Sequence, residues 1–415
     1  RASGNKSRRH YFCPAAVPML NKDSFAFTLL ISGLIAMPPL STDFSLPAYG
    51  ATAAALGTET PRIALTLSFF MLGFAVGPLF YGPASERFGR KPVLLAGLGL
   101  YTAAAFLCTL TPNLWLLLAS RLFQGFAAAA GTVIAVACIR DSFDGPEGRR
   151  MMSYAMIING VMPLTAPSIG VAVLALAGWR AIYALMTAGG LVLFFGVLAG
   201  LPETIRRKNP DALSPHGLFG GYRNVLIHPV SARASLVNAF GFGAMFAFIS
   251  GSPIFLIDAM HLPGRIFGLI FACAIAGSIL GTFASTVLIR RKKTANDVMA
   301  GGLILMLAAT GTLLALSLAG AYALLPMVCL FFLSNFGMGM MGPNASYAAV
   351  QYLPELAGPA SAVLASTQMV IGALSSSLMA GLFAVVGPVA MPAAMVGFTI
   401  LATVVYFTRP QVRPQ

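Results

Sequence analysis

The stretch that decides the fold is GPASERFGRKP, residues 82–92. It carries four charges in a chain of which only 9% of residues are charged, and uncharged apolar sequence flanks it on both sides. Gly82 and Gly89 permit a tight turn, and charges are costly inside a hydrocarbon layer. The stretch therefore indicates a short polar turn between two membrane-spanning segments.

The composition of the whole chain agrees with that interpretation. Of the 415 residues, 58% are apolar and 43 are glycine, and the mean hydropathy is +0.83. A chain this apolar does not fold in water and stay dispersed. No long polar stretch is present that would build a separate soluble domain. We therefore expect an all-α integral membrane protein.

Apolar segments between charges and Pro/Gly turns predict the spans, since a helix needs about 20 apolar residues to cross the hydrocarbon core. Twelve segments result, at 24–48, 61–81, 92–110, 113–139, 151–177, 179–201, 233–257, 264–289, 297–317, 321–345, 358–384 and 387–407. The last four come from two uncharged stretches, 298–354 and 356–408, each of which is too long for a single span.

The distribution of Lys and Arg predicts the orientation, because cytoplasmic loops retain these residues. With both termini cytoplasmic, the cytoplasmic segments carry 22 of the 26 basic residues, and the outer loops carry only Arg62, Arg180 and Arg265. This asymmetry accounts for the net charge of +14 without a nucleic-acid partner, and the expected partners of these charges are anionic lipid headgroups. We expect a multi-pass protein of the inner (cytoplasmic) membrane.

A basic connector broken by Pro and Gly divides the chain near its middle, with six predicted spans on each side. Two such halves around a shared interface are typical of transporters that bind substrate near mid-membrane. The predicted units are a cytoplasmic tail at 1–22, a six-helix bundle at 23–201, the connector at 202–232, a second six-helix bundle at 233–408 and a cytoplasmic tail at 409–415.

The sequence gives no sign of a catalytic or metal site. The five cysteines are dispersed without a Cys-x-x-Cys spacing, so we expect them to be free thiols. The four histidines have no metal-ligand spacing, and no Ser/His/Asp or Gly-x-Ser-x-Gly arrangement occurs. We therefore expect no cofactor and no metal.

The charged turn resembles the G-x-x-x-D-R-x-G-R-[RK] motif of the major facilitator superfamily. The matching residues are Gly82, Arg87, Gly89, Arg90 and Lys91. Glu86 stands where the family usually has Asp. We interpret the turn as a cytoplasmic gate in which Asp141, at the end of the fourth span, is the partner of Arg90. The alternative is a basic loop that only follows the positive-inside rule.

Three further segments resemble the bicyclomycin/chloramphenicol-resistance drug exporters of this superfamily or its proton-coupled members. RLFQG at 121–125 is similar to R-x-x-Q-G, and STDFSLPA at 41–48 is similar to T-D-x-Y-L-P-A. NGVMPLTAPSIG at 159–170 resembles the antiporter signature of the fifth span, although Ala166 stands where the family favours Gly; the matching residues are Gly160, Pro163, Pro167 and Gly170. The resemblance implies two pseudo-symmetric six-helix bundles, and we expect a monomer.

Asp43 and Arg121 are the two clear charges within predicted spans, and each costs about 2.5–3.5 kcal/mol on insertion scales. Counted from the cytoplasmic end of its own span, each residue lies roughly 30 Å along the helix axis. The two side chains therefore share a depth in the membrane and can meet. We interpret them as a proton-coupling pair, with Gln124 one turn from Arg121. The alternative is that this depth lies at the outer interface, where Asp43 is merely solvated.

The predicted substrate cavity contains these three residues and four intramembrane amides. The amides are Asn238, Asn335, Asn344 and Gln368. Amides equally serve as hydrogen-bond partners between helices, so both roles stay open. For Asp258, at the outer end of the seventh span, we expect a surface role.

Taken together, these features predict a proton-coupled exporter of small amphiphilic compounds, including antimicrobials, that works by alternating access. A metabolite or amino-acid transporter of the same fold, acting as exporter, symporter or facilitator, is the alternative. A membrane-embedded enzyme or receptor is a third class, which the absence of a catalytic constellation or signalling domain in the sequence disfavours.

Overall fold

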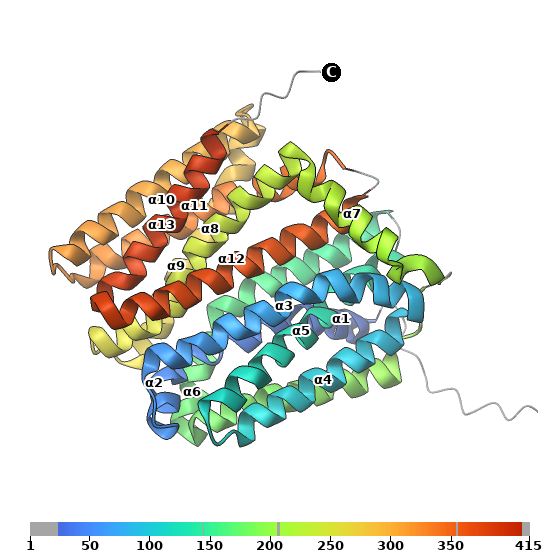
Figure 1. Cartoon of the computed structure of the whole chain (residues 1–415), viewed down its shortest axis with the longest axis horizontal. Coiled ribbons are helices and arrows are strands. Elements are labelled where there is room, and N and C mark those ends of the chain that lie inside the picture. Colours follow the sequence, from blue (N-terminus) through green and yellow to red (C-terminus); the bar gives the residue numbers. More distant parts are fainter. Residues whose placement is uncertain (1–23, 144, 206–207, 354–355, 409–415) are drawn as a thin grey trace, which may run out of the picture.

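A computed structural model of the chain describes residues 24–143, 145–205, 208–353 and 356–408, and in these ranges its regular secondary structure is all helical, without strands (Figure 1). The predicted tails at 1–22 and 409–415 lie outside the described residues, as does Cys13. The other four cysteines are free thiols, as predicted.

The first six spans form the lower group of helices in Figure 1. Helix α1 (Phe25–Asp43) continues through the turn η1 (Leu46–Ala48) into α2 (Tyr49–Ala55). The spans that follow are α3 (Thr60–Phe88), α4 (Arg90–Leu110), α5 (Leu114–Ser142) and α6 (Gly145–Gly200). Helix α6 breaks at Gly178, where φ is 77°, so it holds the fifth and the sixth span.

The connector and the last six spans follow. The connector contains η2 (Pro210–Leu213) and α7 (Pro215–Ile227), and α8 (Pro229–Pro253) runs on into a π-helical turn, η3 (Ile254–Ala259). The remaining elements are α9 (Gly264–Arg290), α10 (Ala295–Leu318), α11 (Leu324–Val350), α12 (Ala357–Val386), η5 (Gly387–Val389) and α13 (Ala390–Phe407).

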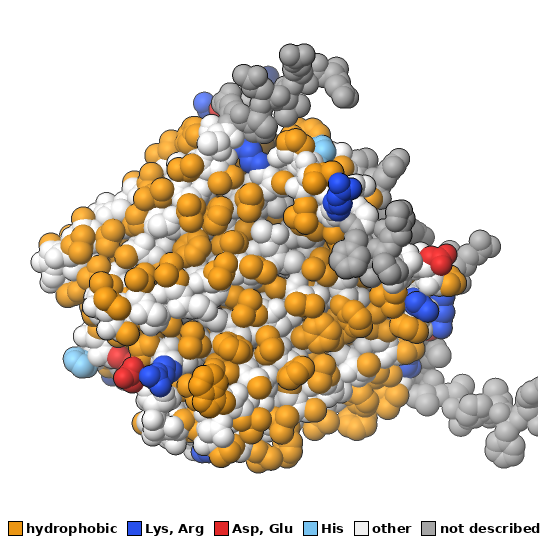
Figure 2. Space-filling view, in the orientation of Figure 1, with side chains coloured by type: hydrophobic (Ala, Val, Ile, Leu, Met, Phe, Trp, Pro, Cys, Tyr) orange, Lys and Arg blue, Asp and Glu red, His pale blue; other side chains and the backbone are white. Residues whose placement is uncertain are grey.

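The described residues contain ten continuous helical stretches that are long and apolar enough to cross a membrane. Two of them, Gly145–Gly200 with 56 residues and Ala357–Phe407 with 51, each hold two spans. The twelve predicted spans are therefore present, in two groups of six. Figure 2 shows apolar side chains over most of the visible face and the charged ones gathered toward the ends of the helices.

Several spans are longer than the sequence predicts. The first runs past residue 48 to Ala55, and the fifth begins at Gly145 rather than at 151. The polar turn at 82–92 is correspondingly shorter, because residues 82–88 continue α3 and Arg90 already begins α4. Gly89 alone makes the turn, with φ at 112°, a conformation that residues with a Cβ rarely adopt.

The prediction that the second span ends at residue 81 is wrong, although Pro83 follows directly. Proline has no N–H for the carbonyl four residues earlier, which here belongs to Leu79. The hydroxyl of Tyr222, in connector helix α7, donates to that carbonyl at 3.0 Å. Because the freed acceptor gains a new donor, the helix continues through Pro83.

The two bundles pack against each other along α3 and α12 and along α6 and α9. At the end where α1 reaches α2, one apolar core contains residues of both bundles, among them Leu46, Tyr49 and Leu67 of the first with Phe248 and Phe255 of the second. We call this the outer end, after the orientation that the Lys and Arg distribution predicts. The opposite end carries the charged turn and the connector, and we call it the basic end.

Candidate functional site

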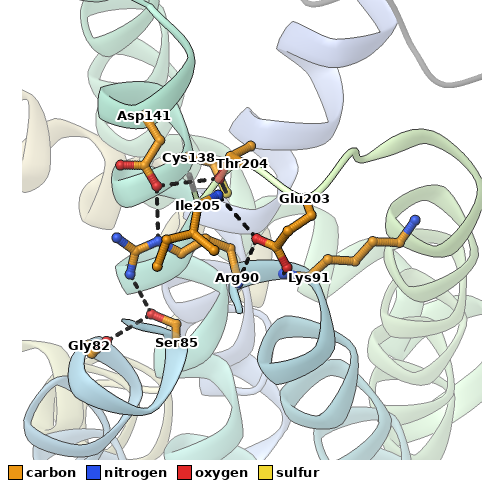
Figure 3. A network of polar contacts seen from close by, with 9 residues as sticks. All are labelled: Gly82, Ser85, Arg90, Lys91, Cys138, Asp141, Glu203, Thr204 and Ile205. Atoms are coloured by element: carbon orange, nitrogen blue, oxygen red, sulfur yellow. Dashed lines mark hydrogen bonds and ion pairs between the residues drawn. The ribbon is translucent and has the colours of Figure 1, made fainter. Parts of the chain in front are cut away.

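At the basic end, the charged turn contacts the ends of α3 and α5 through polar side chains (Figure 3). Arg90 Nε donates to Asp141 Oδ2 at 3.0 Å, an ion pair that confirms the predicted partner. Arg90 Nη1 donates to Ser85 Oγ at 2.7 Å. The buried guanidinium therefore joins the end of α3 to the end of α5, and the ion pair lies wholly within the first bundle.

Glu203, which the sequence analysis does not single out, holds the start of α4 (Figure 3). Its carboxylate accepts from the backbone N–H of Arg90 at 2.9 Å and of Lys91 at 3.3 Å. The first N–H groups of a helix have no acceptor within the helix, and Gly89 has no side chain to supply one. A carboxylate from elsewhere in the chain is therefore favourable at this position.

The other charges of the predicted gate make different contacts. Glu86 is exposed, and its backbone carbonyl accepts from the N–H of Asn209 in the connector at 3.0 Å. The guanidinium of Arg87 lies over the ring of Phe88, 5.5 Å from its centroid. Lys91 Nζ donates to the Leu198 carbonyl at 2.9 Å. No ion pair joins Glu86 to Arg90, and the gating role of this group stays a prediction.

A cavity of about 510 Å³ lies between the bundles at the basic end. Helices α3 and α5 line one side, α12 lines the other, and η2 and α7 of the connector complete the wall. Glu86, Arg90 and Arg140 contribute charged groups to the lining, and Tyr222 and Pro359 contribute apolar surface. The structure is therefore hollow between the bundles at one end and sealed by a shared core at the other.

Asp43 and Arg121 are both buried in the first bundle, with exposed fractions of 4% and 0%. The alternative of a solvated Asp43 is therefore wrong. Asp43 Oδ1 accepts from Thr42 Oγ1 at 2.9 Å. Arg121 Nη1 donates to Gln124 Oε1 at 2.7 Å, and the guanidinium lies 4.5 Å from the centroid of the Phe70 ring. The structure places no ion pair between Asp43 and Arg121.

Tyr49, which sequence reasoning missed, is buried in the same bundle. Its hydroxyl, and Nε and Nη2 of Arg121, have no hydrogen-bond partner among the described residues. A buried donor without a partner costs about 1–3 kcal/mol, and more when it is charged. The arrangement therefore favours any state of the protein in which these donors find an acceptor.

The four amides predicted for the cavity are hydrogen-bonded inside the second bundle. Gln368 Nε2 donates to Asn238 Oδ1 at 2.7 Å, and Asn238 Nδ2 donates to the Gly342 carbonyl at 2.9 Å, which ties together α8, α11 and α12. Asn344 donates to Ser285 Oγ at 2.8 Å, and Asn335 to the Phe331 carbonyl at 2.9 Å. None of the four lines the cavity at the basic end, nor do Asp43, Arg121 and Gln124.

The antiporter-like motif lies in the first half of α6, where Pro163 and Pro167 are inside the helix. A Cβ at Gly170 would lie 2.4 Å from the Phe44 carbonyl oxygen, whereas Gly160 faces open space. A Cβ at Gly268 of α9 would lie 2.8 Å from Ser168 Oγ, which belongs to the same stretch of α6. This stretch therefore packs closely against both bundles. Asp258, as expected, is exposed at the outer end.

The sequence model of the Major Facilitator Superfamily matches residues 25–376. The chain belongs to this superfamily. It is 27% identical over 362 residues to the bicyclomycin resistance protein homolog of Haemophilus influenzae, a match that covers 87% of this chain and 90% of the relative. It is 26% identical over 356 residues to multidrug resistance protein D of Escherichia coli, which covers 85% and 88%.

Solved structures share the superfamily fold. A bacterial homolog of the human lysosomal transporter Spinster, in an inward-facing and occupied conformation, aligns with a TM-score of 0.72 at 15% identity, covering 92% of this chain and 94% of that one. The superfamily member described here is thus a multi-pass membrane transporter of small molecules, not an enzyme.

Proposed function

We propose that this chain is a proton-coupled exporter of small amphiphilic compounds, antimicrobials among them, that works by alternating access. The observation that carries the proposal is that Asp43 and Arg121, an acid and a base, are both buried in the first bundle without an ion pair between them. The names of the two curated relatives, a bicyclomycin resistance protein homolog and a multidrug resistance protein, support antimicrobials as the substrate class.

Asp43 is the residue that we assign to the proton. When it is protonated it is neutral and needs no counterion, and hydrogen bonds such as that from Thr42 suffice. When it releases the proton, the carboxylate gains acceptor capacity, and Nε and Nη2 of Arg121 are unpartnered donors in the same bundle. Proton release and the reorientation of Arg121 are thus expected to occur together, with Gln124 holding the guanidinium between the two states.

Alternating access assigns opposite roles to the two ends of the molecule. The cavity at the basic end admits substrate from the cytoplasm, on the orientation that the Lys and Arg distribution predicts. For release, the shared core at the outer end parts and the basic end closes. We assign the closure to the charged turn, in which Arg90 and Asp141 contribute an ion pair and the connector contacts α3 through Tyr222.

The moving bodies in this proposal are the predicted bundles at 23–201 and 233–408, joined by the connector at 202–232, in a monomer of the inner membrane with both termini cytoplasmic. Amides of the second bundle, such as Asn238 and Gln368, supply polar contacts to substrate if the outer state opens their hydrogen-bond network. No metal or cofactor takes part.

The proposal is tested by drug susceptibility across a chemical panel that includes bicyclomycin, in an efflux-deficient bacterium that expresses the chain. Expression is expected to raise resistance to several amphiphilic compounds, and Asp43→Asn is expected to abolish the gain at equal protein level. Unchanged susceptibility to every compound would contradict drug export.

The direction of transport separates this proposal from a symporter or facilitator. In inside-out vesicles with an acidic interior, an exporter is expected to accumulate substrate while it releases protons, because the vesicle interior corresponds to the outside of the cell. A symporter would be driven by the opposite pH gradient, and a facilitator would not respond to either gradient. Either of those outcomes would replace antiport with the alternative.

A further inference from the structure

A second hollow of about 570 Å³ lies on the side of the first bundle, between the starts of α1 and α6, which pack against each other. Its floor includes the buried side chains of Phe143 and Met151, and Thr28 Oγ1 lies 3.6 Å from the sulfur of Met151. Its apolar rim is exposed: Phe25 to 80% and Ile157 to 60%. The groove is separate from the cavity between the bundles.

The side chains that α6 contributes to the groove change from polar to apolar along the helix. In order from the helix start they are Glu147, Arg150, Met151, Tyr154, Ile157 and Ile158. A span of about 20 residues counted back from the break at Gly178 ends near Ile158. The isoleucines therefore lie at the edge of the hydrocarbon, and Tyr154, Arg150 and Glu147 lie in the headgroup layer or beyond it.

The polar end of the groove offers one acceptor and several donors. Arg150 Nε donates to Tyr154 Oη at 2.8 Å, which leaves the two Nη groups and the tyrosine O–H as donors toward a ligand. Glu147 and Arg150 are three residues apart on one helix face, yet the structure places no ion pair between them. The carboxylate and the guanidinium thus each present a charge at the mouth of an apolar groove.

We propose that this groove binds a membrane phospholipid with a phosphate and a primary ammonium group, that is, a phosphatidylethanolamine. In such a headgroup the ammonium lies farther from the bilayer centre than the phosphate. The order on α6 is complementary, because Glu147 lies about 4.5 Å farther out than Arg150 along the helix axis. Arg150 and Tyr154 hold the phosphate, Glu147 accepts hydrogen bonds from the ammonium, and an acyl chain lies along Met151, Phe25 and the two isoleucines.

The binding site is tested with the detergent-solubilised full-length chain and three phospholipids that carry identical acyl chains: phosphatidylethanolamine, phosphatidylcholine and phosphatidylglycerol. Native mass spectrometry measures how much of each lipid the protein retains. We expect wild-type protein to prefer phosphatidylethanolamine about fivefold over phosphatidylglycerol, which has no ammonium group, the size of one favourable ion pair at an exposed site. The preference over phosphatidylcholine is expected to be smaller, because its quaternary ammonium keeps the charge and loses only the hydrogen bonds to Glu147. Equal retention of all three would overturn the proposal.

Variants of groove residues test whether the preference for phosphatidylethanolamine arises in the groove. Glu147→Gln is expected to remove the preference over phosphatidylcholine, whose quaternary ammonium has no N–H to donate. Arg150→Gln is expected to weaken retention of all three lipids about fivefold, and Ile158→Trp, which fills the groove, to abolish the preference. Arg149→Gln is the matched control, since Arg149 is exposed and does not line the groove. Equal effects of Arg149→Gln and Arg150→Gln would refute the site.

A second copy of the chain is the competing occupant. Ile157→Cys, in a background with the five native cysteines replaced by alanine, is expected to stay monomeric on oxidation. A disulfide-linked dimer formed at that position would overturn lipid binding in favour of a protein contact. Because none of these readouts requires transport, failure of the lipid site leaves the proposed export untouched.

Discussion

The two bundles repeat one helix crossing and fill it with different side chains. In the first bundle α3 crosses α5 so closely that a Cβ at Gly73 would lie 1.9 Å from the Leu122 carbonyl oxygen. In the second, α9 crosses α11 in the same way, and a Cβ at Gly277 would lie 2.4 Å from the Phe332 carbonyl oxygen. A second glycine follows four residues later on each helix, at Gly77 and Gly281, as in other tightly packed membrane helices.

The residue that precedes Leu122 in the first bundle differs in chemistry from the residue that precedes Phe332 in the second. In α5 it is Arg121 and in α11 it is Phe331, and both are fully buried. The phenylalanine ring packs 4.9 Å from the ring of Phe248. The arginine lies over Phe70 with two of its nitrogens unpartnered among the described residues. Equivalent backbone geometry thus supports an apolar core in one bundle and a buried charge in the other.

The polar groups of the two bundles also differ in how well they are paired. Asn238, Gln368 and Asn344 in the second bundle have hydrogen bonds across helices. In the first, Asp43 and Arg121 have partners only within their own helices apart from the ring contact. These three amides thus hold helices of the second bundle together, whereas Asp43 and Arg121 stay available for a change of partners. The contrast concerns these residues alone, since Asn335 of the second bundle bonds only within its own helix and Ser41 of the first bonds to Tyr101 across helices.

The largest expected effect tests whether the crossings are equivalent. A Cβ at Gly125 would lie 1.8 Å from the Phe70 carbonyl oxygen, and one at Gly339 would lie 2.0 Å from that of Ser278. Both contacts involve backbone, so Gly125→Val and Gly339→Val are each expected to cost about 3 kcal/mol or more. The yield of monodisperse protein on size exclusion measures this. Gly189→Val, at a position with open space, is the control, and tolerance at one crossing alone would break the comparison.

The second prediction exchanges the chemistry of the two crossings. Arg121→Phe installs in the first bundle the residue type of the second, and it removes a buried charge that has no ion-pair partner in the structure and is therefore costly to bury. We expect an unchanged or raised melting temperature and no transport driven by a pH gradient. A variant that still couples transport to the gradient would show that Arg121 is only a packing residue.

A third prediction concerns the amide network. Asn238→Ala leaves Gln368 and the Gly342 carbonyl without their partner, which is expected to lower the free energy of unfolding by about 1–3 kcal/mol. Transport per folded molecule is expected to remain dependent on the pH gradient. Thermal unfolding in detergent and vesicle transport measure the two effects separately. If Asn238→Ala kept normal stability but its transport no longer depended on the pH gradient, the proton site would have to lie in the second bundle.

The smallest effect is expected at the basic end. Arg90 is buried but its partner Asp141 is partly exposed to solvent, with 10% and 23% of their side chains accessible, so we expect their ion pair at the membrane surface to contribute about 1 kcal/mol. The prediction requires that the pair is stronger when the basic end is closed, and a difference of that size shifts a balanced two-state transporter about fivefold. Arg90→Ala is expected to raise the cytoplasmic labelling rate of a cysteine at Ala362, a residue of the cavity lining.

Arg149→Ala is the control for that measurement, because Arg149 is exposed and lies outside the charged turn. Labelling that is unchanged by Arg90→Ala, together with loss of protein level or of membrane orientation, would mean that the charged turn serves only topology. In that case the closure of the basic end would rest on the connector and on packing.

Much of the fold is predictable from the sequence because it depends on local composition. Twelve apolar segments separated by charges or by Pro/Gly turns determine the spans, and the pairing of Arg90 with Asp141 follows from the topology of consecutive spans. The ends of the spans are harder to predict, since whether a helix ends at Pro83 depends on contacts such as the donor that satisfies the Leu79 carbonyl. That donor, Tyr222, lies 143 positions further along the chain, where no local pattern reveals it.

The site is less predictable because several of its contacts join distant segments. Glu203 binds the start of α4 although it lies 113 residues further along the chain. The sequence indicates only that an acceptor is needed there, because Gly89 before the helix has no side chain to accept from the first backbone N–H groups. For the amides the sequence left two roles open, and only the packing of α8, α11 and α12 shows which groups Asn238 contacts. Asp43 and Arg121 were identifiable because charges inside apolar spans are rare.

The central claim is that Asp43 in the first bundle carries the proton. It is tested most directly with purified Asp43→Asn in proteoliposomes, by comparing substrate exchange without a pH gradient with accumulation driven by one. The account predicts that the variant exchanges substrate at a rate near that of wild type and accumulates none. Accumulation driven by the pH gradient in Asp43→Asn would contradict it, because the proton would then have to bind elsewhere.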